Sequence, residues 1–214
     1  DLFALNLASS PLKMSGKMDI NTVGNNVNEF TGDVQINDLK VFTKDTTFEL
    51  KQIIVDSKQS VNRSKVLSVT SDLGSIVIDG EYDIPNVVRS VKKVIFTNYP
   101  HITKTWKEDV AKFKVDQKFD FNINLLESQN FLSLIGLPNS GFRKVSLKGK
   151  LDTYKNELSI ATTSPYIKIN KDSINNIQIL VTSNAKSGDI LVHIDSTYAL
   201  GRHFNPIDFQ TNMK

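Results

Sequence analysis

Apolar and polar residues alternate strictly along several stretches of this chain, and this pattern limits the possible folds more than any other feature. The clearest case is residues 119–125 (FDFNINL), in which every second side chain is apolar. The same period of two occurs over 76–84, 145–151 and 190–194. A period of two over four or more residues is typical of a β-strand that buries one face only. The chain is therefore predicted to be mainly β, with strands that are apolar on one side.

Weaker versions of the pattern predict more strands. They are expected around 34–42, 47–55, 66–71, 158–162, 166–169, 174–182 and 207–211. Within the first of these, the alternation slips at Asn37 and Asp38, which predicts a β-bulge. Turn-forming residues separate the runs, as at 23–26, 139–141 and 186–189. Strand spacings of about 10–15 residues favour a meandering antiparallel sheet.

Short helices interrupt this pattern. After Pro85, apolar residues recur at helical spacing, which predicts a helix near 86–96 that ends before Pro100. A second short helix is expected over 106–113, and a third over 128–134.

The densely charged residues 97–118 are the best candidate for a joint between two parts of the chain. We therefore expect a first β segment at 1–96, which includes the helix near 86–96. A charged linker at 97–118 leads to a second β segment at 119–214.

Composition narrows the class of protein. Hydrophobic residues make up 39% of the chain, as expected if about every second strand position is polar. The net charge of +3 comes from 26 basic and 23 acidic residues, a balance too even for a nucleic-acid partner. There is no Cys, and no apolar run is long enough to span a bilayer as a helix. Because the chain begins in a strand-like segment at Asp1, without an initiator Met or signal peptide, we expect it to be an interior piece of a longer protein.

The sequence gives little support for catalysis. The three His residues are scattered, and no Gly-x-Ser-x-Gly motif is present to carry a nucleophilic Ser. No Gly-rich loop precedes a helix to hold phosphate, so no nucleotide cofactor is expected. The protein is therefore predicted not to be an enzyme and to need no cofactor.

One segment resembles the start of a calcium-binding loop. Asp19, Asn21 and Gly24 have the required spacing, but Val23 and Phe30 stand where oxygen ligands are needed. We interpret this segment as a turn and predict no metal site.

Gly80 and Gly149 fall on the apolar faces of their strands. Such a Gly indicates either a bend of the sheet or the close approach of another group, and a bend is the simpler interpretation.

The apolar strand face is what remains to be explained. In a closed β-sandwich it would pack on a second sheet about 10 Å away, and the pattern alone favours this common fold. In a curved half-pipe it would line an open groove in which acyl chains replace the second sheet. The candidate lining residues are the alternating apolar residues Ile76, Ile78, Tyr82, Ile84, Phe119, Phe121, Ile123, Leu125, Val145, Leu147, Leu151, Ile190, Val192 and Ile194.

Several segments, taken in order, resemble the long AsmA-like proteins of Bacteroidota, of the TamB type (translocation and assembly module). They are 1–7 (DLFALNL), 12–21 (LKMSGKMDIN), 30–42 (FTGDVQINDLKVF), 79–85 (DGEYDIP), 98–100 (NYP), 119–125 (FDFNINL) and 134–138 (LIGLP). The resemblance covers nearly the whole chain. It implies an elongated, curved antiparallel sheet, called a β-taco, with a hydrophobic interior, and no catalytic residues.

The resemblance also implies a function. Such proteins resemble bridge-like lipid-transfer proteins that are anchored in the inner membrane and extend into the periplasm. They are expected to shield phospholipid acyl chains on the way to the outer membrane, or to assist outer-membrane biogenesis with a partner of the BamA/TamA type. The alternative, from the residues, is a closed β-sandwich module for adhesion or glycan binding.

Overall fold

In a computed structural model, the described residues of the protein form one antiparallel β-sheet of 13 strands. The structure describes residues 13–26, 28–42, 47–59, 64–99, 103–113, 115–126, 132 and 140–213. Within these residues no second sheet packs on the first, so the expected open, curved all-β fold is confirmed and the sandwich is not formed.

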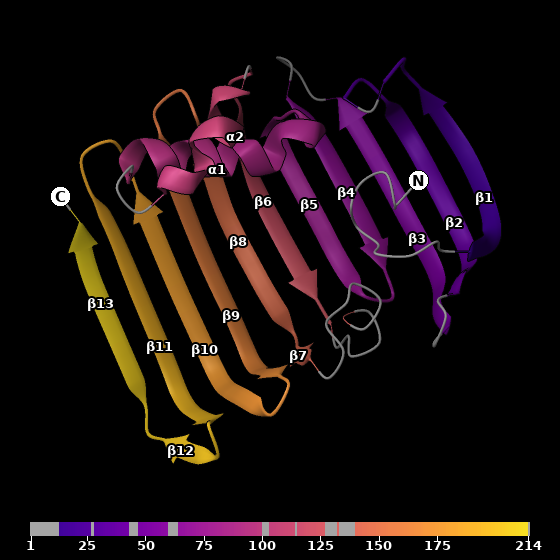
Figure 1. Ribbon diagram of the computed structural model, residues 1–214. Helices are drawn as coiled ribbons and strands as arrows, with labels where there is room; N and C mark the ends of the chain where they lie inside the picture. Colours follow the sequence, from indigo (N-terminus) through magenta and orange to yellow (C-terminus); the bar gives the residue numbers. More distant parts are fainter. Residues whose placement is uncertain are drawn as a thin grey trace.

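The strands cross the sheet almost in chain order, as the meander prediction requires (Figure 1). Most neighbours along the chain are also hydrogen-bonded neighbours in the sheet. The strands are β1 (Lys13–Val23), β2 (Thr31–Phe42), β3 (Thr47–Gln59), β4 (Lys65–Ser71), β5 (Gly74–Glu81), β6 (Lys118–Leu125), β7 (Gly141–Arg143), β8 (Val145–Asp152), β9 (Glu157–Ile169), β10 (Asp172–Ser183), β11 (Gly188–Ala199), β12 (Arg202–Phe204) and β13 (Ile207–Met213).

Two positions in the sheet are each filled by two short strands. β7 and β8 both pair with β9, and β12 and β13 both pair with β11. The sequence predicted two strands at 158–162 and 166–169, but the structure has the single strand β9 there. The predicted helix at 128–134 lies outside the described residues except for Leu132, which is helical.

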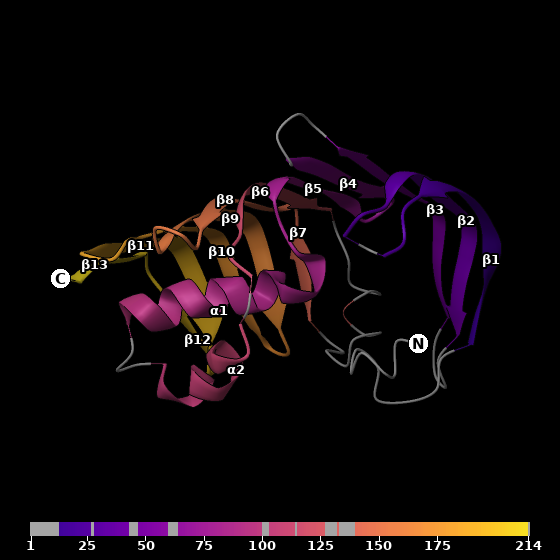
Figure 2. The same cartoon turned by 90° about the horizontal axis from the view of Figure 1, so that it is seen from above.

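Apart from the single helical residue Leu132, the described helices lie between β5 and β6. They are η2 (Ile84–Asn86), α1 (Val87–Asn98), η3 (Lys104–Trp106) and α2 (Lys107–Ala111). The predicted start is confirmed, because Pro85 occupies the first turn of η2. α1 lies across the strands on the concave side of the sheet, and α2 lies against α1 (Figure 2).

The helix α1 covers part of the sheet because one side of it is apolar. Val94 is fully buried, and Val91 and Ile95 pack on the same cluster. The opposing sheet residues include Phe119, which is 3% exposed, and Leu151, which is 1% exposed. This cluster is the main core of the protein; its other buried members are Leu67, Tyr82 and Leu158.

Hydrogen bonds join the two ends of the helical segment to each other and to residues in or next to the sheet. At its start, the Asp83 amide donates to the buried Gln117 side-chain carbonyl at 3.0 Å. At its end, the Gln117 amide donates to the Thr153 hydroxyl at 2.8 Å. The C-terminal turn of α1 is held by Asn98, whose amide donates to the Ser183 hydroxyl at 2.7 Å.

The two strands that flank the helical segment in sequence are direct neighbours, so the sheet is continuous there. β5 and β6 pair along their length, from Gly74 opposite Leu125 to Glu81 opposite Lys118. Strands from both predicted segments, 1–96 and 119–214, therefore belong to one sheet. The division of the chain into these two segments stays a prediction.

The predicted bulge in 34–42 is present. Gly16 on β1 faces an extra residue on β2, where the pairing moves from Lys17 opposite Asn37 to Ser15 opposite Lys40. Asp38 has a φ of 52°, a left-handed conformation that shifts the alternation by one residue. Apolar side chains thus stay on the same face on both sides of the bulge.

Two interpretations of local sequence were wrong. The segment from Asp19 to Val23 is the end of β1 and not a turn, because it pairs in register with β2. At Gly149 a close approach, and not only a bend, excludes a side chain. A Cβ there would collide with the Phe121 ring and with the Ser159 carbonyl oxygen.

Candidate functional site

A row of mostly apolar side chains crosses the concave face, with one residue from each strand except the short strands β7 and β12. Residues that are direct partners in neighbouring strands point to the same face, so the pairing defines this row. We call it the central row: Ile20, Val34, Val55, Val69, Ile76, Ile123, Leu147, Thr162, Ile179, Val192 and Phe209. All but Thr162 are apolar, and no member is charged.

Two further rows flank the central row at a spacing of two residues. The helix-side row contains Thr22, Gly32, Ser57, Leu67, Ile78, Phe121, Gly149, Ile160, Val181, Ile190 and Thr211. The far row contains Met18, Ile36, Ile53, Ser71, Gly74, Leu125 and Val145, and continues on β9–β13 with Ser164, Ile177, Ile194 and Ile207. These rows also contain no charged residue. We call the surface formed by the three rows the trough.

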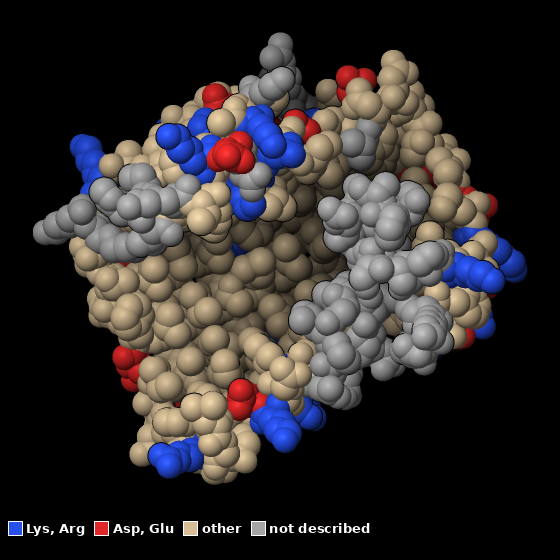
Figure 3. All heavy atoms as spheres, viewed as in Figure 1, with Lys and Arg blue, Asp and Glu red and all other residues tan. Residues whose placement is uncertain are grey.

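The trough is covered only in part. The core cluster, to which α1 contributes Val94, is in contact with Ile78, Phe121 and Ile160 of the helix-side row, and with Val55 and Val69 of the central row. Most of the central row is half-buried in the described structure. In Figure 3 the hollow below the helices is free of Lys, Arg, Asp and Glu where described residues are visible.

At both edges of the sheet the trough is exposed. On β1, Met18 is 57% exposed and Ile20 is 63% exposed. On β13, Ile207 is 41% exposed and Phe209 is 52% exposed. Apolar side chains of this size are normally removed from water, so the face as described lacks an apolar partner at its edges.

The structure brings nearly all of the sequence-predicted lining residues to the concave face. Ile76, Ile123, Leu147 and Val192 lie in the central row; Ile78, Phe121 and Ile190 in the helix-side row; and Leu125, Val145 and Ile194 in the far row. Phe119 and Leu151 lie one row beyond, beneath α1. Tyr82 follows β5, and Ile84 lies in η2.

Three of these residues belong to the core beneath α1. Tyr82, Phe119 and Leu151 are each less than 9% exposed, and the Tyr82 and Phe119 rings meet edge to face at 6.4 Å. Burial, together with the nearby Asp79 carboxylate, raises the pKa of the Tyr82 phenol. These side chains bind the helix to the sheet and do not face the uncovered part of the trough.

The trough residues of the outer strands were not among the predicted lining residues. They include Ile20, Val34, Val55, Val69, Ile179 and Phe209 of the central row. The strands 34–42, 47–55, 66–71, 174–182 and 207–211 were expected, and their alternation was the signal that would have identified all of these residues except Ile20, whose strand β1 was not expected.

The opposite face of the sheet is polar. Asp120 is paired with Lys150, and their side chains form an ion pair of 2.9 Å. A ladder of small polar groups runs beside it, in which the Ser146 hydroxyl donates to the Asn124 carbonyl at 3.0 Å. The predicted one-sided alternation therefore holds in three dimensions.

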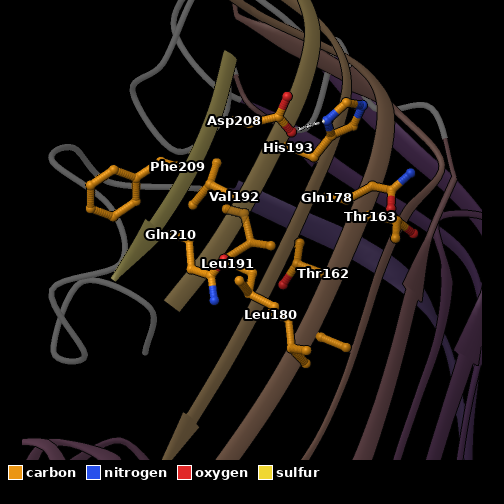
Figure 4. A pocket seen from close by; sticks show the side chains of 12 residues that line it. Thr162, Thr163, Gln178, Leu180, Leu191, Val192, His193, Asp208, Phe209 and Gln210 are labelled. Atoms are coloured by element: carbon orange, nitrogen blue, oxygen red, sulfur yellow. Dashed lines mark hydrogen bonds and ion pairs between the residues drawn. The ribbon is translucent and has the colours of Figure 1, made fainter. Parts of the chain in front are cut away.

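This polar face has a hollow of about 500 Å³ on β9, β10, β11 and β13 (Figure 4). Leu180 and Leu191 form its apolar part and are 40% and 37% exposed. His193 points toward Asp208, as the dashed line in the figure marks, and its Nδ1 lies 2.6 Å from the carboxylate. Its Nε2 lies 2.9 Å from Asp195.

The two carboxylates change the acid–base behaviour of His193. The hydrogen bonds to Asp208 and then to Asp195 raise the pKa of this exposed imidazole. The Asn176 amide and His193 together lower the pKa of Asp195. Since Asp208 is on β13 and His193 on β11, the pair helps attach the last strand to the sheet.

The geometry supports binding of apolar groups better than it supports chemistry. Across the part of the chain that the structure describes, no three His, Asp or Glu side chains are arranged to hold a metal ion. None of the described helices is long and apolar enough to cross a membrane. A small apolar cavity of about 150 Å³ lies in the trough among residues that include Val69, Ile76, Leu125 and Phe142.

The fold and the trough together define the class of this protein: an open, curved antiparallel sheet with an uncharged apolar concave face and a polar convex face. Comparison of the chain with family models, curated proteins and solved structures finds no match.

Proposed function

We propose that this chain is a non-catalytic segment of a periplasmic AsmA/TamB-like protein that shields lipid acyl chains in its trough. The single observation that carries the proposal is the central row, which is apolar from edge to edge apart from Thr162. In a longer protein anchored in the inner membrane, this trough would serve phospholipid transport to the outer membrane and outer-membrane biogenesis. A partner of the BamA/TamA type would act through the full-length chain.

The trough has the physical properties that a lipid conduit needs. An acyl chain that leaves water gains about 0.8 kcal/mol for each buried CH₂ group. The three rows offer no charged group that would hold the chain at one place. Successive strands present similar apolar side chains about 4.8 Å apart, so a chain can move across the sheet without a large change in free energy.

The exposed edges are consistent with this use. The central row ends in water at Ile20 and at Phe209. A lipid lying over these residues would supply the apolar surface that the described chain does not.

Photo-crosslinking tests the proposal. A photoreactive residue is placed at Phe121, Leu147 or Val192 on the concave face, in the chain mixed with phospholipid vesicles. Leu191 and Lys148 are matched controls, because they neighbour Val192 and Leu147 in sequence but lie on the convex face. We expect phospholipid adducts from the first set only.

Lipid carried through purification gives a second measurement. We expect phospholipid to be present in a solvent extract of the purified chain. We also expect a delipidated sample of the chain to take up phospholipid again from vesicles.

Equal crosslinking from both faces of the sheet, or no crosslinking from Leu147 and Val192, would contradict the proposal.

A further inference from the structure

Positive charge is concentrated in the helical segment beside the trough. Residues 84–118 contain eight Lys or Arg and three Asp or Glu, whereas the whole chain has a net charge of only +3. The remainder of the chain is therefore slightly negative. Such local concentration points to an interaction with an anion.

The described side chains show which cations are available. Lys93 is paired with Asp116 at 2.7 Å and also lies over the Phe113 ring, so it helps hold α2 on α1. The hydrogen bond from Lys93 lowers the pKa of Asp116. By contrast, Arg89 donates only to the neutral Asn86 amide carbonyl, at 2.8 Å.

Arg89, Lys107 and Lys112 are all exposed. Among the described residues, no carboxylate lies within ion-pair distance of any of these three, which we call the cationic rim.

This rim lies at the border of the apolar surface. Figure 3 shows Lys and Arg side chains, with fewer Asp and Glu among them, gathered over α1 and α2 directly above the hollow. α1 runs across the strands, along the same direction as the three rows (Figure 1). Positive charge is thus placed along one side of the trough and not at a single point.

The width of the trough, measured along a strand from the helix-side row to the far row, matches the length of one acyl chain. Phe121 packs against the core cluster that α1 covers, and Leu125 lies in the far row four residues away on the same strand. Four strand residues span about 14 Å. One leaflet of a bilayer core of about 30 Å is about 15 Å thick, which is the length of one ordered acyl chain.

We infer that the trough selects anionic lipids, with the head group at the cationic rim and the acyl chain along the strands toward the far row. The inference rests on the proposed function, because it assigns the head-group chemistry of the same ligand. The head group is a phosphate with net negative charge, as in phosphatidylglycerol. It would stay in water at the rim while the chain lies in the trough.

The test compares two fluorescent lipids that differ in head-group charge. The 214-residue chain is mixed with acyl-labelled phosphatidylglycerol, which is anionic, or acyl-labelled phosphatidylcholine, which has no net charge. We expect about tenfold tighter binding of phosphatidylglycerol at low salt, from exposed ion pairs that are individually weak. High salt should reduce the difference.

Charge-neutralising variants locate the effect. The triple variant Arg89→Gln, Lys107→Gln, Lys112→Gln should bind both lipids equally. A control variant, Lys17→Gln, Lys148→Gln, Lys171→Gln, removes the same charge from exposed lysines away from the rim and should keep the preference. Equal loss in both variants would overturn the inference, since net charge and not the rim would then be responsible.

The remaining outcomes separate the two proposals. If the unmodified chain binds both lipids equally, the head-group inference fails and the proposed function stands. If it binds neither lipid, both fail. Inorganic phosphate and unlabelled phosphatidylglycerol are also compared as competitors of the labelled lipid. Equal displacement by the two competitors would overturn the inference, because the acyl chain would then contribute nothing to binding.

Discussion

The strands beneath α1 and the first strand of the sheet share one side-chain pattern but have opposite environments. On β8, Leu151 is 1% exposed because α1 lies over it. On β1, every residue is exposed, including the apolar Met18 and Ile20. The alternation therefore indicates which side of a strand is apolar, whereas the burial of that side depends on what other parts of the chain lie over it.

This comparison predicts the largest effect for truncation beneath the helix. Leu151→Ala should lower the free energy of unfolding by about 3 kcal/mol, through lost burial and the cavity left behind. Ile20→Ala, at a side chain 63% exposed, should change it by less than about 0.5 kcal/mol. Urea denaturation measures both. Similar losses in the two variants would mean that β1 has a cover in solution.

Adding a side chain beneath the helix should be the next largest effect. Gly149→Ala places a Cβ against the Phe121 ring and the Ser159 carbonyl oxygen, so we expect a loss of about 1–3 kcal/mol. Gly141→Ala is the control, because no atom lies within 4 Å of its Cβ position. The second substitution Phe121→Leu should recover part of the loss, which a double-mutant cycle in urea would show.

The two faces of one strand should differ in lipid binding. Val192→Asn should weaken binding of an acyl-labelled lipid by about fivefold, since about 1 kcal/mol of apolar contact is lost. Leu191→Asn, one residue away on the convex face, should leave it unchanged. Fluorescence titration compares them; a larger effect at Leu191 would place the ligand on the wrong face for our proposal.

The smallest effect concerns the last strand and pH. The pKa of His193 is raised by Asp208 and Asp195, so its protonated form is favoured in the folded state. This stabilisation is complete below the unfolded pKa of about 6.5 and is lost as the pH rises through the higher folded value. Amide exchange in β13, corrected for intrinsic rates, should therefore be slower at about pH 6 than at about pH 8.

Replacement of the imidazole provides the control for this pH effect. His193→Asn should remove the difference between the two pH values, while His203→Asn should retain it. An NMR titration of the His193 ring checks the direction of the pKa shift independently. A ring pKa below its ordinary value would contradict the prediction.

Local features of the fold could be predicted from the sequence. The alternation located most of the strands but not β1, β7 or β12, Pro85 marked the start of the helical segment, and the slip at Asn37 marked the bulge. Each of these depends on neighbouring residues. The close approach at Gly149 could not be predicted, because it depends on a ring from β6 and a carbonyl from β9.

The same limit applies to the candidate site. The lining residues could be identified from alternation, but which of them α1 covers depends on how a segment returns onto the sheet. Tyr82 and Phe119 were grouped with Val192, although the first two are core and the last faces the trough. Periodicity determines the face of a residue and carries no information on its depth.

The pairing of Glu81 with Lys118 has a consequence for how the protein folds. The helical segment leaves the sheet and returns to it at the same place, so it is a long insertion in one hairpin of an otherwise local meander. Closing a loop about nine times longer than a four-residue turn costs about 2 kcal/mol more in chain entropy. The other strands of the meander mostly pair with chain neighbours and can form before that loop closes. We therefore expect the meander to assemble first, with its apolar face in water, and the helices to settle on it last.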